Sequence, residues 1–83
     1  MKKIELKEKM IEKNMIKMTN GEDWFLNNPF GIDYPCFIKG NYEIMDLENL
    51  KGDYEIISWI IEGEGQEVEG VIYYFQVPVL KQV

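Results

Sequence analysis

Two runs rich in β-branched and aromatic residues dominate the C-terminal half of this 83-residue chain. Tyr54–Ile61 and Glu67–Val77 each have the composition typical of a strand. Gly63–Gln66 lies between them and predicts the turn that joins them. Strands joined by so short a turn must pair antiparallel. The chain is therefore expected to fold around an antiparallel sheet.

The N-terminal segment has a different pattern. Residues 2–13 interleave lysines with glutamates and predict a helix, in which Glu5 and Lys9 form an i,i+4 pair in the favourable order. Helical spacing beyond this segment would place four apolar residues within one narrow arc, namely Ile4, Ile11, Met15 and Met18. A longer helix, ending at Met18, is therefore an alternative.

Asn20-Gly21 favours another interpretation of the segment that follows. This dipeptide is typical of a type I′ hairpin turn, because both residues tolerate a positive φ. It is flanked by Met15–Thr19 and Glu22–Leu26, which could form the two arms. We expect a helix to about residue 12 and then a hairpin.

The middle of the chain predicts a loop and a further strand. Residues 27–35 contain two prolines and a glycine and are expected to form a loop. Residues 36–46 are expected to form a strand, with a break at Lys39-Gly40-Asn41. The predicted fold is a single α+β domain over residues 1–83, with a short N-terminal helix and a five-stranded antiparallel sheet. Such a sheet could curl into a small SH3/Sm-like barrel.

A short N-terminal helix followed by Met15–Leu26, with Thr19-Asn20-Gly21-Glu22 at the turn, resembles the opening of Sm-like small barrels. This resemblance implies an oligomeric barrel subunit. In that family a basic residue beside a glycine near the last strand contacts RNA. Here Gly70 is flanked by Glu69 and Val71, so the resemblance does not extend to RNA binding.

The composition argues against the common kinds of active site. The chain has neither His nor Arg, and Ser58, Thr19 and Cys36 are the only residues of their types. No histidine is available to activate a nucleophile, and the many carboxylates are expected to form solvated strand faces rather than a hydrolytic pair. The single cysteine is expected to be a small buried hydrophobic residue. A zinc site lacks ligands, and no calcium loop or phosphate-binding loop occurs. We therefore expect no enzyme activity, no metal and no cofactor.

The formal net charge of -6 is distributed unevenly. Residues 1–20 contain six lysines and three glutamates, whereas residues 41–70 contain nine acidic residues and one lysine. We expect a negative face that binds a basic surface of another protein, with Trp24 or Tyr42 as an aromatic anchor. The acidic residues predicted for this face are Asp46, Glu48, Asp53, Glu55, Glu62, Glu64, Glu67 and Glu69.

These features predict a small acidic protein-binding module. It could be an inhibitor that occupies the cationic nucleic-acid groove of a host defence protein or nuclease, as small acidic phage proteins of similar composition do. The alternative is a structural or oligomeric Sm-like subunit, in which Val71–Val79 supplies an exposed edge for strand pairing. We expect no direct contact with nucleic acid and no membrane contact. The absence of an apolar leader and the single cysteine predict a cytoplasmic location, in a bacterial or phage-infected cell.

Overall fold

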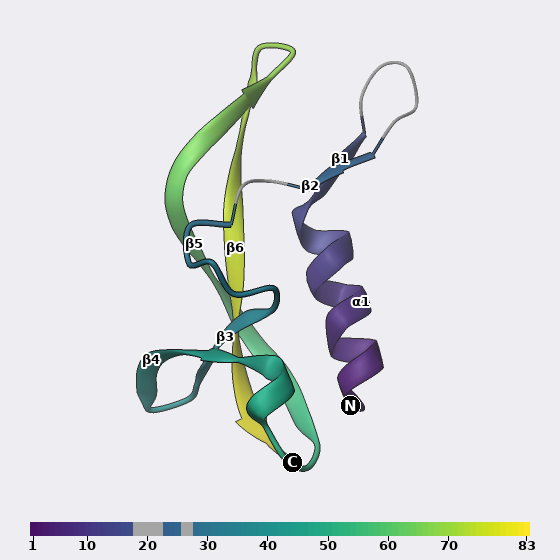
Figure 1. Cartoon of the computed structure of the whole chain (residues 1–83), viewed down its shortest axis with the longest axis vertical. Helices are drawn as coiled ribbons and strands as arrows, with labels where there is room; N and C mark the ends of the chain where they lie inside the picture. The colour runs from purple at the N-terminus through teal and green to yellow at the C-terminus, as the bar shows by residue number, and fades with distance from the viewer. Residues whose placement is uncertain (18–22, 26–27) are drawn as a thin grey trace.

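The computed structural model describes residues 1–17, 23–25 and 28–83, with side chains for residues 1–15 and 28–83 (Figure 1). The chain order of its elements is α1 (Lys3–Asn14), β1 (Met15–Lys17), β2 (Asp23–Phe25), β3 (Pro35–Ile38), β4 (Asn41–Asp46), the 3₁₀ helix η1 (Leu47–Asn49), β5 (Tyr54–Val68) and β6 (Val71–Gln82). The predicted α+β class with a short N-terminal helix is confirmed.

The main sheet has four strands in the order β4-β3-β6-β5. The pairs β3–β4 and β5–β6 are antiparallel hairpins, but β3 runs parallel to β6, with Phe37 opposite Val79 and Ile38 opposite Leu80. The prediction of five antiparallel strands is therefore wrong. The connection from β3 to β6 runs through β4, η1 and β5, which is long enough for a parallel pair. Because β4 and β5 are free edges, this sheet is open and does not close into the predicted barrel.

The segment after α1 forms a two-stranded antiparallel sheet of its own. β1 and β2 pair with Met15 opposite Phe25 and Lys17 opposite Asp23. This pairing confirms the predicted hairpin and excludes the alternative helix to Met18, since α1 ends at Asn14. The predicted turn residues Asn20-Gly21 lie outside the described residues.

The hairpin of β5 and β6 turns later in the chain than expected. Gly63–Gln66 is not the turn but an irregularity inside β5, where the register shifts between Glu62 and Gln66. The turn is Glu69-Gly70, whose φ angles of 53° and 81° are both left-handed, as a type I′ turn requires. Gly65 is needed within the irregularity, because a Cβ there would lie 2.3 Å from Cγ2 of Ile72.

The two faces of β6 carry the two parts of the core. Leu80 packs with Leu6, Met10 and Leu47 on the face that α1 covers. The alternate residues Val77 and Val79 pack with Phe37 and Phe75 on the opposite face. The sheet is thus buried on both sides along Val77–Leu80 of β6.

The buried stripe of α1 is not the one that helical spacing suggested. Leu6, Met10 and Asn14 are buried at intervals of four residues, whereas Ile4 is 64% exposed. The two stripes lie on different sides of the helix. No helix among the described residues is long and apolar enough to cross a membrane.

Asn14, the last residue of α1, joins the helix to the sheet. Its side-chain Nδ2 donates to the carbonyl of Gln76 at 2.9 Å, and its Oδ1 accepts from the backbone N–H of Gln76 at 2.8 Å. The same Nδ2 lies 3.2 Å from the carbonyl of Met10. Asn14 therefore occupies the position on β6 that another strand would take, and it leaves no buried polar group of its own unsatisfied.

Candidate functional site

The acidic residues predicted to form one face are divided by the structure between two ends of the molecule. Glu48 and Asp46 lie beside the N-terminal half of α1. The Glu48 carboxylate pairs with Lys7, and its backbone carbonyl accepts from Nζ of Lys3 at 3.0 Å. Oδ1 of Asp46 accepts a hydrogen bond of 3.0 Å from the backbone N–H of Glu48, and Asp46 thereby caps the N-terminus of η1. Asp53 and Glu55 follow, at the turn before β5 and at its start.

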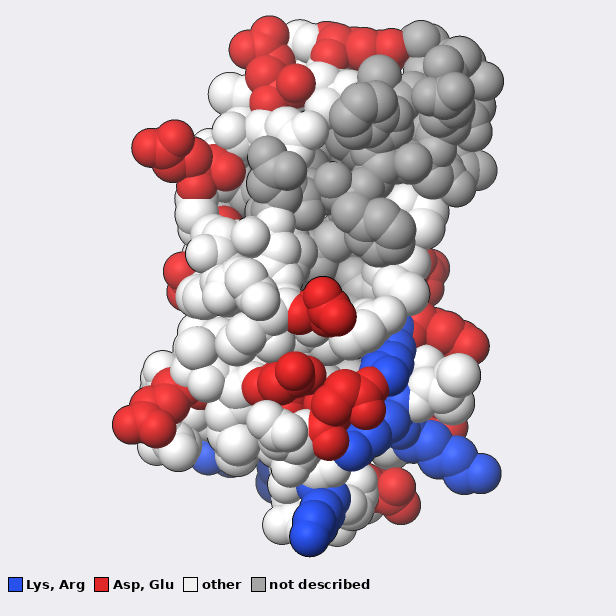
Figure 2. All heavy atoms as spheres, viewed as in Figure 1, with Lys and Arg blue, Asp and Glu red and all other residues white. Residues whose placement is uncertain are grey.

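The other four acidic residues lie at the far end of the β5–β6 hairpin, and we call this group the acidic end: Glu62, Glu64, Glu67 and Glu69. No lysine occurs between Lys51 and Lys81. On the face shown in Figure 2, all visible lysines lie in the half of the molecule that holds the N-terminus of α1. At the opposite end, the charged side chains seen among the described residues are all acidic. On this face the described lysine side chains are thus confined to one half of the molecule, whereas acidic side chains occur along its length.

Neither of the two residues predicted as an aromatic anchor, Trp24 and Tyr42, is shown by the structure at the acidic end. Tyr42 lies on β4, the edge strand opposite β5, where it is 64% exposed and its ring centroid is 6.1 Å from that of Phe37. The side chain of Trp24 lies outside the described side chains. The structure therefore brings together half of the predicted acidic face and separates it from Tyr42.

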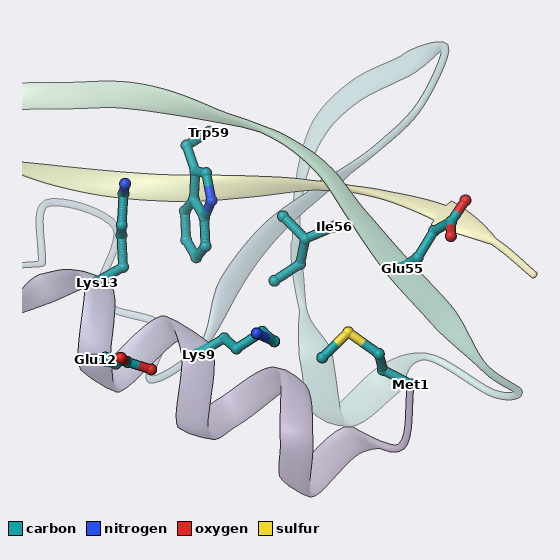
Figure 3. A pocket seen from close by; sticks show the side chains of 7 residues that line it. All are labelled: Met1, Lys9, Glu12, Lys13, Glu55, Ile56 and Trp59. Carbon is teal, nitrogen blue, oxygen red and sulfur yellow. The ribbon is translucent and has the colours of Figure 1, made fainter.

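A groove between α1 and β5, with a volume of about 580 Å³, was not predicted from the sequence. Ile56 and Trp59 of β5 point toward the helix, and Met1 closes one end (Figure 3). Lys9, Glu12 and Lys13 line the helix side, with Nζ of Lys13 5.6 Å from the centroid of the Trp59 ring. The groove has an apolar floor and a charged rim. The one sequence signal for it was a tryptophan within an otherwise aliphatic strand.

The strand beside this groove has a free outer edge. β5 pairs with β6 only, and no described residue adds a strand on its other side. Its central run, Ile56–Ile61, contains no charge, no proline and no glycine, and Ile61 is 60% exposed. A long, uncharged edge of this kind is a template for a further strand. The run expected to supply such an edge, Val71–Val79, lies in β6, which pairs with β5 on one side and with β3 only at Val79 and Leu80 on the other.

Chemistry at Cys36 is suppressed by its surroundings. The side chain is fully buried and its Sγ lies 3.4 Å from the carbonyl of Met45. Burial, with a smaller contribution from the charge of Asp46, raises the pKa of the thiol to about 11. The interpretation of Cys36 as a small buried hydrophobic residue is confirmed. Among residues 1–15 and 28–83, no three groups of metal-ligand type cluster together.

Comparisons with protein-family models, with curated proteins and with solved structures give no match for this chain. We therefore infer its function from the arrangement of its own residues.

Proposed function

We propose that this chain is a small protein-binding module whose acidic end binds a basic surface of another protein. The observation that carries this proposal is the distribution of charge: on the face shown in Figure 2 no described lysine side chain lies at the acidic end, whereas Glu48 at the other end contacts Lys3 and Lys7. An acidic residue paired within its own chain has little charge left for a partner. The acidic end, which lies apart from the described lysine side chains on the face in Figure 2, sets the field that a partner meets first.

The hairpin that carries the acidic end suits this role. β3 pairs with β6 only at Val79 and Leu80, so the distal part of the hairpin extends past β3. The β5–β6 ladder continues to Val68 opposite Val71, which holds the carboxylates on an ordered support. A projecting hairpin can enter a groove that a flat surface could not. The more specific form of the proposal is an inhibitor that occupies the nucleic-acid groove of a host defence protein or nuclease.

A capture experiment tests both the general proposal of a protein-binding module and its more specific form, an inhibitor of a nucleic-acid groove. The chain is immobilised and incubated with bacterial lysate at low and high salt, and duplex DNA is added as a competitor. We expect a nucleic-acid-binding protein that is captured at low salt and displaced by DNA, because screening weakens exposed charge pairs. The triple substitution Glu64→Lys, Glu67→Lys and Glu69→Lys should abolish this capture.

A matched control keeps the same change in net charge. Glu5→Lys, Glu8→Lys and Glu43→Lys replace three other exposed acidic residues and should preserve capture. Equal loss with both triple variants would show that net charge alone matters, and unchanged capture with the first would place the interface elsewhere. Capture that DNA does not displace would retain the binding module but contradict the nucleic-acid groove.

The second candidate function is an oligomeric structural subunit, and the free edge of β5 is the observation that favours it. Two copies could pair through exposed strands to form a larger sheet. Solution mass over a range of concentrations tests this candidate. A chain that stays monomeric at high concentration contradicts it.

A further inference from the structure

We propose that the outer edge of β5 binds an extended segment of a partner protein as a fifth strand, and that this segment has apolar residues between two basic residues six positions apart. This surface shares only Glu62 with the acidic end, and the inference depends on the outer edge of β5 rather than on the function proposed above.

The backbone groups that would bind such a strand can be identified from the pairing of β6. The backbone N–H and C=O of Gln76 bond to Asn14, so they point away from β5. In an antiparallel pair, the groups of the opposite residue, Ile61, then point outward as well. The carbonyl of Leu80 accepts from the backbone N–H of Lys39 at 2.8 Å, which in the same way places the groups of Ile56 on the outer edge.

Two further positions on the same edge fit this pattern. Trp59 lies opposite Pro78, two residues from the Gln76 pair, so its N–H and C=O also face outward. Pro78 has no N–H to donate, and at this position none is required by β5. The carbonyl of Tyr54 already accepts a hydrogen bond of 2.9 Å from the amino group of Met1. This contact marks the end of the free edge and shows that the edge takes a donor.

The side chains on the helix side of this edge are apolar. Ile56 and Trp59 form the floor of the groove described above (Figure 3). Ile61 lies opposite Gln76 and continues the same face beyond them. A strand added beside β5 would place alternate side chains on this face. Those side chains are therefore expected to be apolar.

The opposite face of the same edge determines the charge of the partner. Glu55 and Glu62 lie at the two ends of the uncharged run, opposite Lys81 and Phe75 of β6. Lys81 and Phe75 are six residues apart and share the face that points away from α1. The register shift between Ile56 and Ser58 is what brings both glutamates onto that face. A basic side chain placed opposite Glu62 would also point away from Lys9 and Lys13, whereas Glu55 lies at the rim of the groove that these lysines line. Glu62, which faces an aromatic residue rather than a lysine, should contribute more than Glu55.

These two glutamates also argue against a second copy of this chain as the occupant. If two β5 strands paired antiparallel with their uncharged runs aligned, Ile56 would lie opposite Ile61 of the other copy. Glu55 would then lie opposite Glu62 at both ends of the interface. Like charges directly opposite each other destabilise a strand pair. A strand with basic ends meets the same edge without this penalty.

The test uses a synthetic peptide with blocked ends and the sequence Lys-Ile-Thr-Ile-Thr-Ile-Lys. It places both lysines on one face and three isoleucines on the other, and it reads the same in either direction. A second peptide has glutamate at both ends. Calorimetry at low salt should show that the glutamate peptide binds about tenfold more weakly, since two exposed charge pairs are reversed.

Two variants of the full chain locate the binding site. Ile61→Lys places a charge on the outer edge and should weaken binding of the lysine peptide about tenfold or more. Tyr42→Lys makes the same change in charge at an equally exposed position on the other edge strand and should leave binding within about twofold. Backbone NMR spectra of both variants confirm that the fold is kept. Bound peptide should also slow amide exchange at Ile56, Trp59 and Ile61.

Several results would overturn the inference. Equal binding of the two peptides would contradict the charge rule, and equal binding by Ile61→Lys and the unaltered chain would place the site elsewhere. Absence of binding by the lysine peptide would show that the edge is not a docking strand. A dimer in solution that Ile61→Lys abolishes would show that a second copy occupies the edge.

Discussion

The end of the molecule that contains α1 and the end that contains the β5–β6 turn use similar residues in opposite ways. At the α1 end, Leu6 and Leu80 are fully buried and Lys7 pairs with Glu48. At the hairpin end, Ile72 is 56% exposed, and Glu67 lies opposite it in the β5–β6 pair. At the α1 end, apolar side chains are thus buried and charged side chains are paired within the chain, whereas at the hairpin end Ile72 is left largely exposed to solvent.

This difference indicates which end stabilises the fold and which end is available to other molecules. Apolar side chains left in solvent contribute little to folding, and a group of them marks a contact surface. Ile61 and Ile72 belong to such a group, beside the acidic end. Substitutions at Leu80, Asn14 and Gly65, each with a matched second variant, test whether the two ends differ in this way.

The largest effect is expected at the α1 end. Leu80→Ala removes a fully buried side chain from the contact between α1 and β6 and should lower the free energy of unfolding by about 2–5 kcal/mol. Ile72→Ala removes an exposed side chain of the same size from the same strand and should change it by about 0.5 kcal/mol or less. Urea denaturation measures both values. Similar losses would mean that the hairpin end belongs to the core.

The next effect is expected at Asn14, where α1 meets the distal part of the hairpin. Asn14→Asp keeps the shape of the side chain but removes the Nδ2 donor, and so leaves the carbonyl of Gln76 without its partner. A buried acceptor left unsatisfied costs about 1–3 kcal/mol. Asn49→Asp, at an exposed position in η1, is the matched control and should be close to neutral. A neutral Asn14→Asp would show that water replaces the amide.

The smallest effect is expected within the hairpin end, at Gly65. Gly65→Ala places a Cβ against Cγ2 of Ile72 and near the ring of Tyr74. Because Ile72 is exposed and can move, the loss should be about 1 kcal/mol. Combining it with Ile72→Ala should recover at least half of this loss, which a double-mutant cycle detects. Additive effects would place the strain in the backbone rather than in this contact.

The local elements could be predicted from the sequence, since their signals act within a few residues. The alternation of lysine and glutamate predicted α1 to within two residues of its ends, and Asn20-Gly21 predicted that strands rather than a longer helix follow it. The hairpin of β5 and β6 was also predicted. Its turn was placed at Gly63–Gln66 rather than at Glu69-Gly70. Both segments contain glycine, and only the cross-strand register distinguishes a bulge from a turn.

The candidate site depended more heavily on the tertiary structure. The sequence located the acidic residues in 41–70 but not their division between a group near the lysines of α1 and a group at the hairpin end. That division follows from Lys3 and Lys7, which lie far from Glu48 along the chain and reach it only because α1 packs across β6. The groove around Trp59 arises in the same way, from a helix and a strand that are some forty residues apart.

The amino-acid sequence by itself determined the kinds of element, their order, the lack of His and Arg, and the concentration of negative charge in one stretch of chain. The tertiary structure decided that β3 runs parallel to β6, that β5 is left with a free edge, and that Asn14 takes the place of a missing strand. The physical reason is that propensity and turn geometry are local properties. Strand order and edge exposure instead follow from which distant faces bury each other best.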